Sequence, residues 1–210
     1  LMGEAYHKLE RAEEARATLD RAVDTQREVS RRAPNNPAYM RNLSISLWYR
    51  AVVHRSNERD GLARQSIEES VAVANLLRER DPSDAGALRM VAIATEVYAQ
   101  VLADLGQREA SYARGQDVIA AHRDLVRRAD GAPGARRSLA AALMTHGGNS
   151  YNGGAFTQAC ESWTEGEAIY SDLDRTGAMS EHDRTHALSQ ARDFLRAACN
   201  PPRRGLGSRI

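Results

Sequence analysis

The chain has 210 residues, of which 42% are hydrophobic and 27% charged, an ordinary globular mixture that can fill a core. A formal net charge of +1 excludes strong overall attraction to nucleic acid or to a membrane surface. The 35 alanines, against only eleven aromatic residues, favour closely packed helices over a β-sheet, and no run approaches the 18 consecutive apolar residues typical of a membrane span.

Apolar residues recur at spacings of three and four along the chain, a pattern typical of amphipathic helices. Leu43, Leu47 and Ala51 show this spacing, and clusters of Pro, Gly, Asn and Asp separate one periodic segment from the next. In chain order, the pattern predicts helices near residues 1–9, 13–32, 38–57, 62–80, 84–104, 108–129, 135–150, 155–175 and 181–199. It predicts no β-strand.

Similar residues also recur 48 positions apart. Small residues stand at Gly3, Ala51, Ala99 and Gly147, and each is followed twelve positions later by a small residue paired with a larger apolar one, at Ala15/Leu19, Ala63/Ile67 and Ala159/Trp163, with Ser111/Gly115 as a weaker copy. This indicates a repeated pair of helices whose small residues allow close approach. The repeats lie near 1–34, 35–82, 83–130 and 131–178, in a single domain of residues 1–199. A capping helix at 181–199 and a flexible tail at 200–210 follow them.

The order Gly3-x2-Tyr6, then Ala15-x3-Leu19, then Ala22, resembles the signature of the tetratricopeptide repeat, whose usual length is about 34 residues. The resemblance covers residues 1 to about 199. It implies an all-α, right-handed superhelical solenoid of about four antiparallel helix hairpins plus a C-terminal capping helix.

The segment from Pro34 to Leu47 and the ending from Ala159 to Cys199 are similar to the C-terminal repeat regions of bacterial serine/threonine protein kinases. This second resemblance implies a region of a larger bacterial signalling protein. A complete first helix would begin about eleven positions before Leu1 in the 48-residue register, so we expect the chain to be a piece of a longer protein.

The first resemblance implies a binding surface, because the opening helix of each tetratricopeptide hairpin lines the concave groove. Mixed charges with a few aromatic residues suit a protein or peptide segment. An ordinary solvated helix face remains the alternative for any one of these residues. The candidate partner-binding residues are Lys8, Arg41, Trp48, Arg55, Arg89, Glu96, Gln100, Asp104, Arg137, Met144, Tyr151 and Asn152.

Three of these residues, Arg41, Arg89 and Arg137, are 48 positions apart. They would either form a row of guanidinium groups that binds carboxylate or phosphate, or pair with acidic residues of the neighbouring repeat. The second interpretation is favoured, because a repeated architecture repeats its structural ion pairs.

No nucleophile elbow, phosphate-binding loop, HExxH or paired CxxC motif occurs in the sequence. His182 and His186 have a spacing that two metal ligands use, but no third ligand is evident, so a solvated helix face is preferred. We therefore expect a non-catalytic protein–protein interaction module without cofactor or metal, and without nucleic-acid or membrane contact. The alternative is a structural spacer or self-association module, and the oligomeric state stays open.

The two cysteines stand on either side of the turn near residues 177–180. Cys160 lies 19 residues before Met179 and Cys199 lies 20 residues after it, so an antiparallel hairpin places both at nearly the same height. They would either form a disulfide or pack as two small apolar thiols. A disulfide would indicate an oxidising compartment such as a periplasm, whereas free thiols are compatible with a bacterial cytoplasm.

Overall fold

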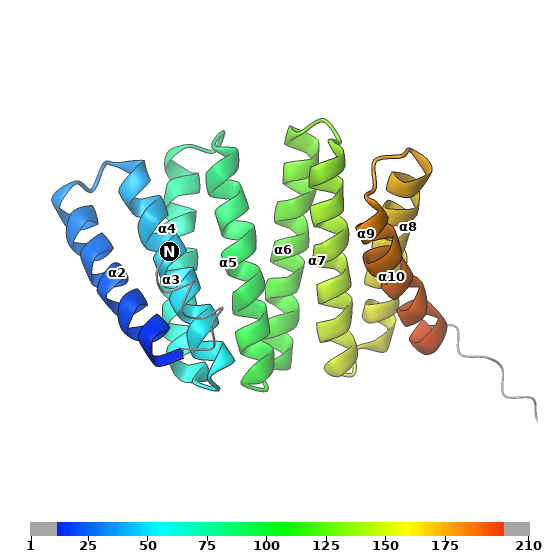
Figure 1. The fold of residues 1–210 in the computed structure, drawn as a ribbon, viewed down its shortest axis with the longest axis horizontal. Helices are drawn as coiled ribbons and strands as arrows, with labels where there is room; N and C mark the ends of the chain where they lie inside the picture. The colour runs from blue at the N-terminus through cyan, green and yellow to red at the C-terminus, as the bar shows by residue number, and fades with distance from the viewer. Residues whose placement is uncertain (1–11, 200–210) are drawn as a thin grey trace, which may run out of the picture. The chain divides into compact units, whose positions relative to one another are not determined.

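The computed structural model describes residues 12–199, which form helices joined by short turns, with no strand in that range (Figure 1). The expected all-α class is therefore confirmed. The expected helix 1–9 and tail 200–210 lie outside the described residues. The long helices are α2 (Ala12–Arg32), α3 (Pro37–Ser56), α4 (Asp60–Arg80), α5 (Ala85–Asp104), α6 (Arg108–Arg128), α7 (Pro133–Asn152) and α8 (Phe156–Arg175).

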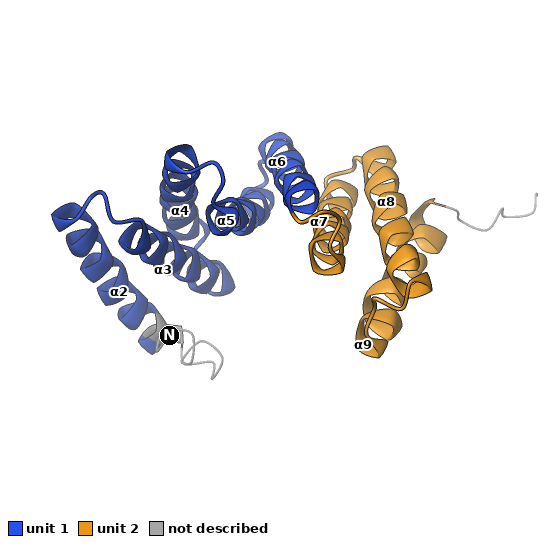
Figure 2. Cartoon of the chain, turned by 90° about the horizontal axis from the view of Figure 1, so that it is seen from above, with its two compact units in different colours: residues 1–128 blue, residues 129–210 orange. Residues whose placement is uncertain are grey.

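The expected capping helix is assembled from four short segments. They are α9 (Glu181–Asp183), the π-helical η1 (Arg184–Leu188), α10 (Ser189–Phe194) and the π-helical η2 (Leu195–Cys199). The chain divides into two compact units, residues 1–128 and residues 129–210 (Figure 2). In the first unit each helix from α2 to α6 packs against the next, and α3 also contacts α5. In the second unit α7 packs on α8, which also contacts η1, α10 and η2.

Capping residues set where the helices begin. Asn36 accepts a hydrogen bond from the backbone N–H of Ala38 at 3.0 Å, directly before Pro37 in the first turn of α3. Asp84 caps α5 by accepting from the N–H groups of Gly86 and Ala87 at 2.8 and 3.1 Å. The capping groups at these two boundaries therefore come from the local sequence.

Small residues hold α3 and α4 close together in the core of the first unit. Ala51 and Ala63 are fully buried, and the Ser44 and Ser70 hydroxyls each donate to the backbone carbonyl of the other residue, at 3.0 and 2.8 Å. A hydroxyl on each helix can reach the other backbone only because no larger side chain separates the helices.

Helix α5 forms the apolar centre of this unit. It is the one described helix that by length and composition could cross a membrane, with a mean hydropathy of 1.2 over its most apolar window. However, 61% of that window is buried inside the protein, and Val91, Ala94 and Val101 pack in a cluster with residues of α3 and α4. Burial of this extent is typical of a core helix.

In the second unit, α7 and α8 pack through Gly147 and Trp163. The Trp163 ring lies directly over Gly147, and its indole N–H donates to the carbonyl of Met144 at 3.2 Å. Further along α8, Leu188 and Ala191 of the cap segments are buried against Tyr170. The cap therefore covers apolar surface of the last hairpin, as the sequence pattern predicts.

Candidate functional site

The most coherent group of predicted binding residues lies on α3 and α5 in the first unit. Along α3, Ile45, Trp48 and Val52 form a half-buried apolar stripe that packs against the core cluster. Arg41 precedes this stripe and Arg55 follows it, both half-buried on the same helix. We call this surface of α3, together with Asp84, Gln100 and Asp104, which contact its two arginines, the α3–α5 face.

An ion pair joins the beginnings of the two helices at one end of the face. The Nη2 atom of Arg41 lies 2.5 Å from Oδ2 of Asp84, while the other Asp84 oxygen caps α5. The N–H groups of Ala87 and Gly86, together with the charge of Arg41, hold the pKa of Asp84 below its usual range. This carboxylate is therefore shared between the cap of α5 and the guanidinium of α3.

A second contact joins the other ends of the helices. Arg55 donates from Nε to Oδ2 of Asp104 at 2.5 Å and from Nη1 to Oε1 of Gln100 at 2.8 Å. Three predicted partner-binding residues, 45 and 49 positions apart in sequence, therefore meet at one point. Together the two contacts hold α3 and α5 at both ends of the apolar stripe.

Trp48 sits more deeply than an open groove residue would. Its side chain is half-buried against the core, its ring meets Tyr49 edge-on at 4.5 Å, and its indole N–H is buried without a hydrogen-bond partner. A buried N–H without a partner is costly, because it has lost its water and gained nothing in return. Trp48 thus serves the core and offers only part of its ring to a ligand.

A polar recess of about 510 Å³ adjoins the Arg55 end of the face. Arg55, Ser56, Glu58, Asp60 and Asp104 line it. Since Arg55 is already occupied by Asp104, the recess presents mainly negative charge from Glu58 and Asp60. Among the described residues, no group of three or more His, Cys, Asp or Glu side chains has the geometry of a metal site.

The other candidates in the first unit are not among the residues of the Arg41–Asp84 and Arg55–Asp104 contacts. Arg89 is exposed on α5 and has no acidic partner in the described part of the chain, whereas Glu96 is half-buried on the same helix. Lys8 lies outside the described residues. In the second unit Arg137 pairs with Asp183 of α9 at 3.0 Å. Two of the three arginines spaced by 48 residues therefore pair with the acidic residue of a following element.

The remaining candidates in the second unit lie on α7. Met144 is half-buried against the core, and Asn152 is exposed as the last residue of the helix. Tyr151 is 42% exposed and contacts Phe156, itself 57% exposed, at a ring distance of 5.1 Å. The Tyr151 and Phe156 rings therefore form a small exposed aromatic pair at the turn between α7 and α8.

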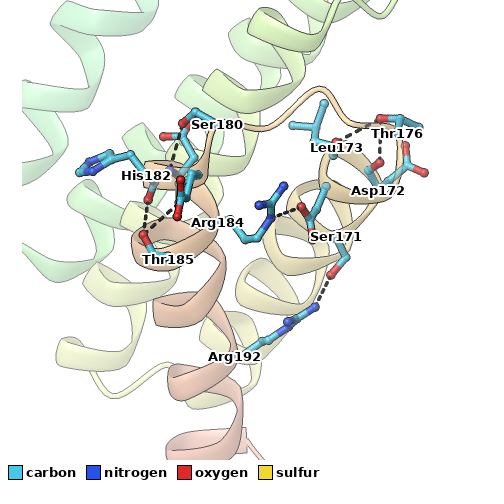
Figure 3. A network of polar contacts seen from close by, with 12 residues as sticks. Ser171, Asp172, Leu173, Thr176, Ser180, His182, Arg184, Thr185 and Arg192 are labelled. Atoms are coloured by element: carbon cyan, nitrogen blue, oxygen red, sulfur yellow. Dashed lines mark hydrogen bonds and ion pairs between the residues drawn. The ribbon is translucent and has the colours of Figure 1, made fainter.

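A polar network ties the cap segments to α8 (Figure 3). Arg192 donates to Ser171 and to Glu167, each at 3.1 Å, and Arg184 donates to Asp174 at 2.5 Å. His182 and His186 stack at 4.2 Å on an exposed face. Cys160 and Cys199 form a disulfide with a Cα–Cα distance of 5.6 Å, so the first of the two alternatives for the cysteines applies.

One surface has no counterpart in the sequence analysis. A cleft of about 480 Å³ lies in the first unit between α4 and α6, with Leu88, Val91 and Thr95 of α5 as its floor. Arg78 of α4 and Asp124 of α6 belong to its walls. The spacing of these residues is the same as that of core positions, so the sequence alone carried no signal that they border a cleft.

The comparisons with known proteins add no assignment to this geometry. No family model matches the sequence, and no curated protein matches it. The candidate site therefore rests on the residues of this chain.

Proposed function

We propose that the chain is an array of helix hairpins with a 48-residue period, which forms a right-handed superhelix of the tetratricopeptide type. Support comes from the helix boundaries, because α3, α5 and α7 begin at residues 37, 85 and 133, and α4, α6 and α8 begin at 60, 108 and 156. In addition, Arg80 donates to the carbonyl of Pro34 at 2.7 Å, and Arg128 donates to that of Pro82 at 2.6 Å. Arg128 and Pro82 each stand 48 positions after the matching residue of the first contact, so the same contact recurs in successive repeats.

The function proposed for this array is non-catalytic binding of a peptide or protein segment along the α3–α5 face. One observation carries the proposal: α3 and α5 are joined at both ends by Arg41–Asp84 and Arg55–Asp104, and an apolar stripe lies between these contacts. A rigid, preformed surface of this kind binds with little ordering cost. Polar groups at both ends would fix the register of the bound segment.

The negative recess beside Arg55 favours a segment with a basic residue near one end. In line with the resemblance of the sequence, the proposed setting is the C-terminal region of a larger bacterial signalling protein, where the array would recruit partners. The Cys160–Cys199 disulfide favours an oxidising compartment for this part of the chain.

Selection from a random peptide library displayed on phage tests the proposal. Affinities of the enriched peptides would then be measured by calorimetry on the native chain and on a variant carrying Arg55→Ala, Gln100→Ala and Asp104→Ala. We expect at least about tenfold weaker binding, which corresponds to about 1.4 kcal/mol. The melting temperature should change little, because partly exposed ion pairs contribute about 0–1 kcal/mol each.

Leu76→Ala is the matched control, since Leu76 is 48% exposed on α4 and does not belong to the α3–α5 face. It should leave peptide affinity unchanged. Peptides that lose affinity with Leu76→Ala but not with the triple variant would contradict the proposal and move the site to α4.

The alternative role, a spacer or self-association module, is favoured by one feature, the exposed Tyr151–Phe156 pair. Light scattering separates the two roles. A mass of 23.1 kDa that is independent of concentration would be expected of a binding module. A multimer that dissociates when Phe156 is replaced by serine would instead support self-association.

A further inference from the structure

The Cys160–Cys199 disulfide differs in its setting from a buried staple. It joins the interior of α8 to the last residue of η2, and both cysteines are only half-buried. Both also line an open depression of about 720 Å³ on the outer side of α8, together with Phe156, Thr164 and Ala168. A small molecule in solvent can therefore reach the sulfur atoms without unfolding the unit.

The segment that the bond holds has little other attachment. None of the five residues of η2 is buried, although η2 lies against α8. The nearest non-covalent contact upstream is the stacking of Phe194 on Trp163, with ring centroids 5.0 Å apart. The disulfide is therefore the main restraint on η2.

The first half of the cap is anchored quite differently. Leu188 and Ala191 are 1% and 0% exposed within the apolar cluster of this unit. Ion pairs from Arg137 to Asp183 and from Arg184 to Asp174 add to this attachment. Loss of the disulfide would therefore leave residues 181–191 in place and affect only the end of the cap.

We propose that Cys160–Cys199 is a thiol–disulfide exchange site, at which a dithiol reductant opens the bond and releases η2 from α8. The inference is independent of the proposed binding role of the α3–α5 face. Opening uncovers the part of α8 that lines the depression, with Thr164 and Ala168. The state of one bond thereby sets which surface the last hairpin presents.

The exchange balances in two steps. A thiolate of the reductant attacks one protein sulfur, a mixed disulfide forms, the Cys160–Cys199 bond breaks, and the departing sulfur takes up a proton. The second thiol of the reductant then displaces the remaining protein sulfur and closes an internal disulfide. The protein gains two electrons and two protons, and the dithiol loses the same number.

The rate of reduction by dithiothreitol tests whether the folded protein reacts. We expect the rate to rise in proportion to the dithiothreitol concentration, because the reagent attacks the bond directly in the native state. A rate that reaches a plateau equal to the unfolding rate would mean that the bond opens only after unfolding, and this would overturn the proposal.

Hydrogen exchange then tests what opening does. After reduction, the amides of residues 195–199 should exchange at least about tenfold faster, while those of residues 184–191 change by less than about twofold. The double variant Cys160→Ser, Cys199→Ser should reproduce this pattern without reductant and should not respond to it. Unchanged exchange in residues 195–199, or loss of protection across α8, would each contradict release of η2 alone.

Discussion

Trp163 lies so close to Gly147 that a Cβ atom built on this glycine would come within 3.0 Å of the indole ring. The helices α7 and α8 therefore approach each other at a distance that only glycine allows at position 147. Nothing comparable surrounds Gly148, the next residue of the same helix, where a Cβ would meet no atom within 4 Å. The two adjacent glycines thus allow a matched comparison.

Gly147→Ala should lower the free energy of unfolding of the second unit by about 1–2 kcal/mol, because overpacking outweighs the better helix propensity of alanine. Gly148→Ala should raise it by about 0.5–1 kcal/mol through propensity alone. Urea unfolding followed by Trp163 fluorescence, in a Trp48→Phe background, measures both. Equal effects of the two changes would show that the Trp163 ring can move aside at little cost.

Glu58 adopts a left-handed backbone conformation, with φ of 56°, in the turn between α3 and α4. Gly106 and Gly154 occupy the corresponding turns with φ of 73° and 84°. A non-glycine residue in this conformation costs about 1–2 kcal/mol of stability. Glycine avoids this cost but loses more backbone entropy on folding, so the net gain from glycine is smaller than the full cost.

Glu58→Gly should therefore stabilise the first unit by about 0.5–1 kcal/mol, read from the shift of the urea midpoint at constant slope. Ala72→Gly on the exposed face of α4 is the control, and there glycine should cost about 1 kcal/mol. A loss of stability with Glu58→Gly would mean that the glutamate side chain contributes more than its backbone conformation costs.

Asp84 performs two tasks that two substitutions separate. Asp84→Asn keeps an N-capping oxygen but loses the charge that pairs with Arg41, so we expect a loss of less than about 1 kcal/mol. Asp84→Ala removes both and should cost about 1–2 kcal/mol. Thermal unfolding of the two variants at low and high salt provides the measurement. If both variants lose the same amount, the cap contributes nothing.

Burial lowers the pKa of three histidines, His54, His122 and His146, and the nearby charge of Arg89 lowers that of His122 further. A histidine whose pKa is lower in the folded state binds a proton more readily when unfolded. Stability should therefore fall as the pH drops from about 7.5 to about 5.5, through the unfolded pKa of about 6.5.

Urea unfolding across this range checks the slope. This pH range lies above the range in which the paired carboxylates titrate, so the carboxylates contribute little to the slope. His122→Leu should reduce the slope, because it removes one titrating group and leaves the part due to His54 and His146. The substitution breaks no hydrogen bond at Nδ1 of His122, since that atom has no partner. An unchanged slope would place the pH dependence elsewhere in the chain.

The helix boundaries were predictable from sequence because they depend on local rules, whereas for the cysteines the sequence predicted equal height and left a disulfide or two free thiols open. Periodicity and breakers set helix ends to within about two residues, and a turn near Met179 brings Cys160 level with Cys199. The site was predictable only as a list of positions on helix faces. That Arg55 already binds Asp104 depends on how closely two helices from different hairpins approach, which no local pattern encodes.

The depth of Trp48 and the cleft beside Arg78 were beyond sequence reasoning for a related reason. A tryptophan on an amphipathic stripe has the same spacing whether its ring faces a ligand or the core. Likewise, the positions that line the cleft share the three- and four-residue spacing of positions that fill the core. Only the separation of α4 and α6 tells them apart.

The reciprocal contact between Ser44 and Ser70 has a consequence for how this protein can vary. Each hydroxyl donates to a backbone carbonyl of the other helix. A single change to alanine therefore leaves a small void, whereas a single change to a larger residue forces α3 and α4 apart. The two positions are therefore energetically coupled, and their individual effects should not add. A replacement larger than serine at one position therefore requires a smaller residue at the other, so among descendants of this sequence positions 44 and 70 are expected to change together.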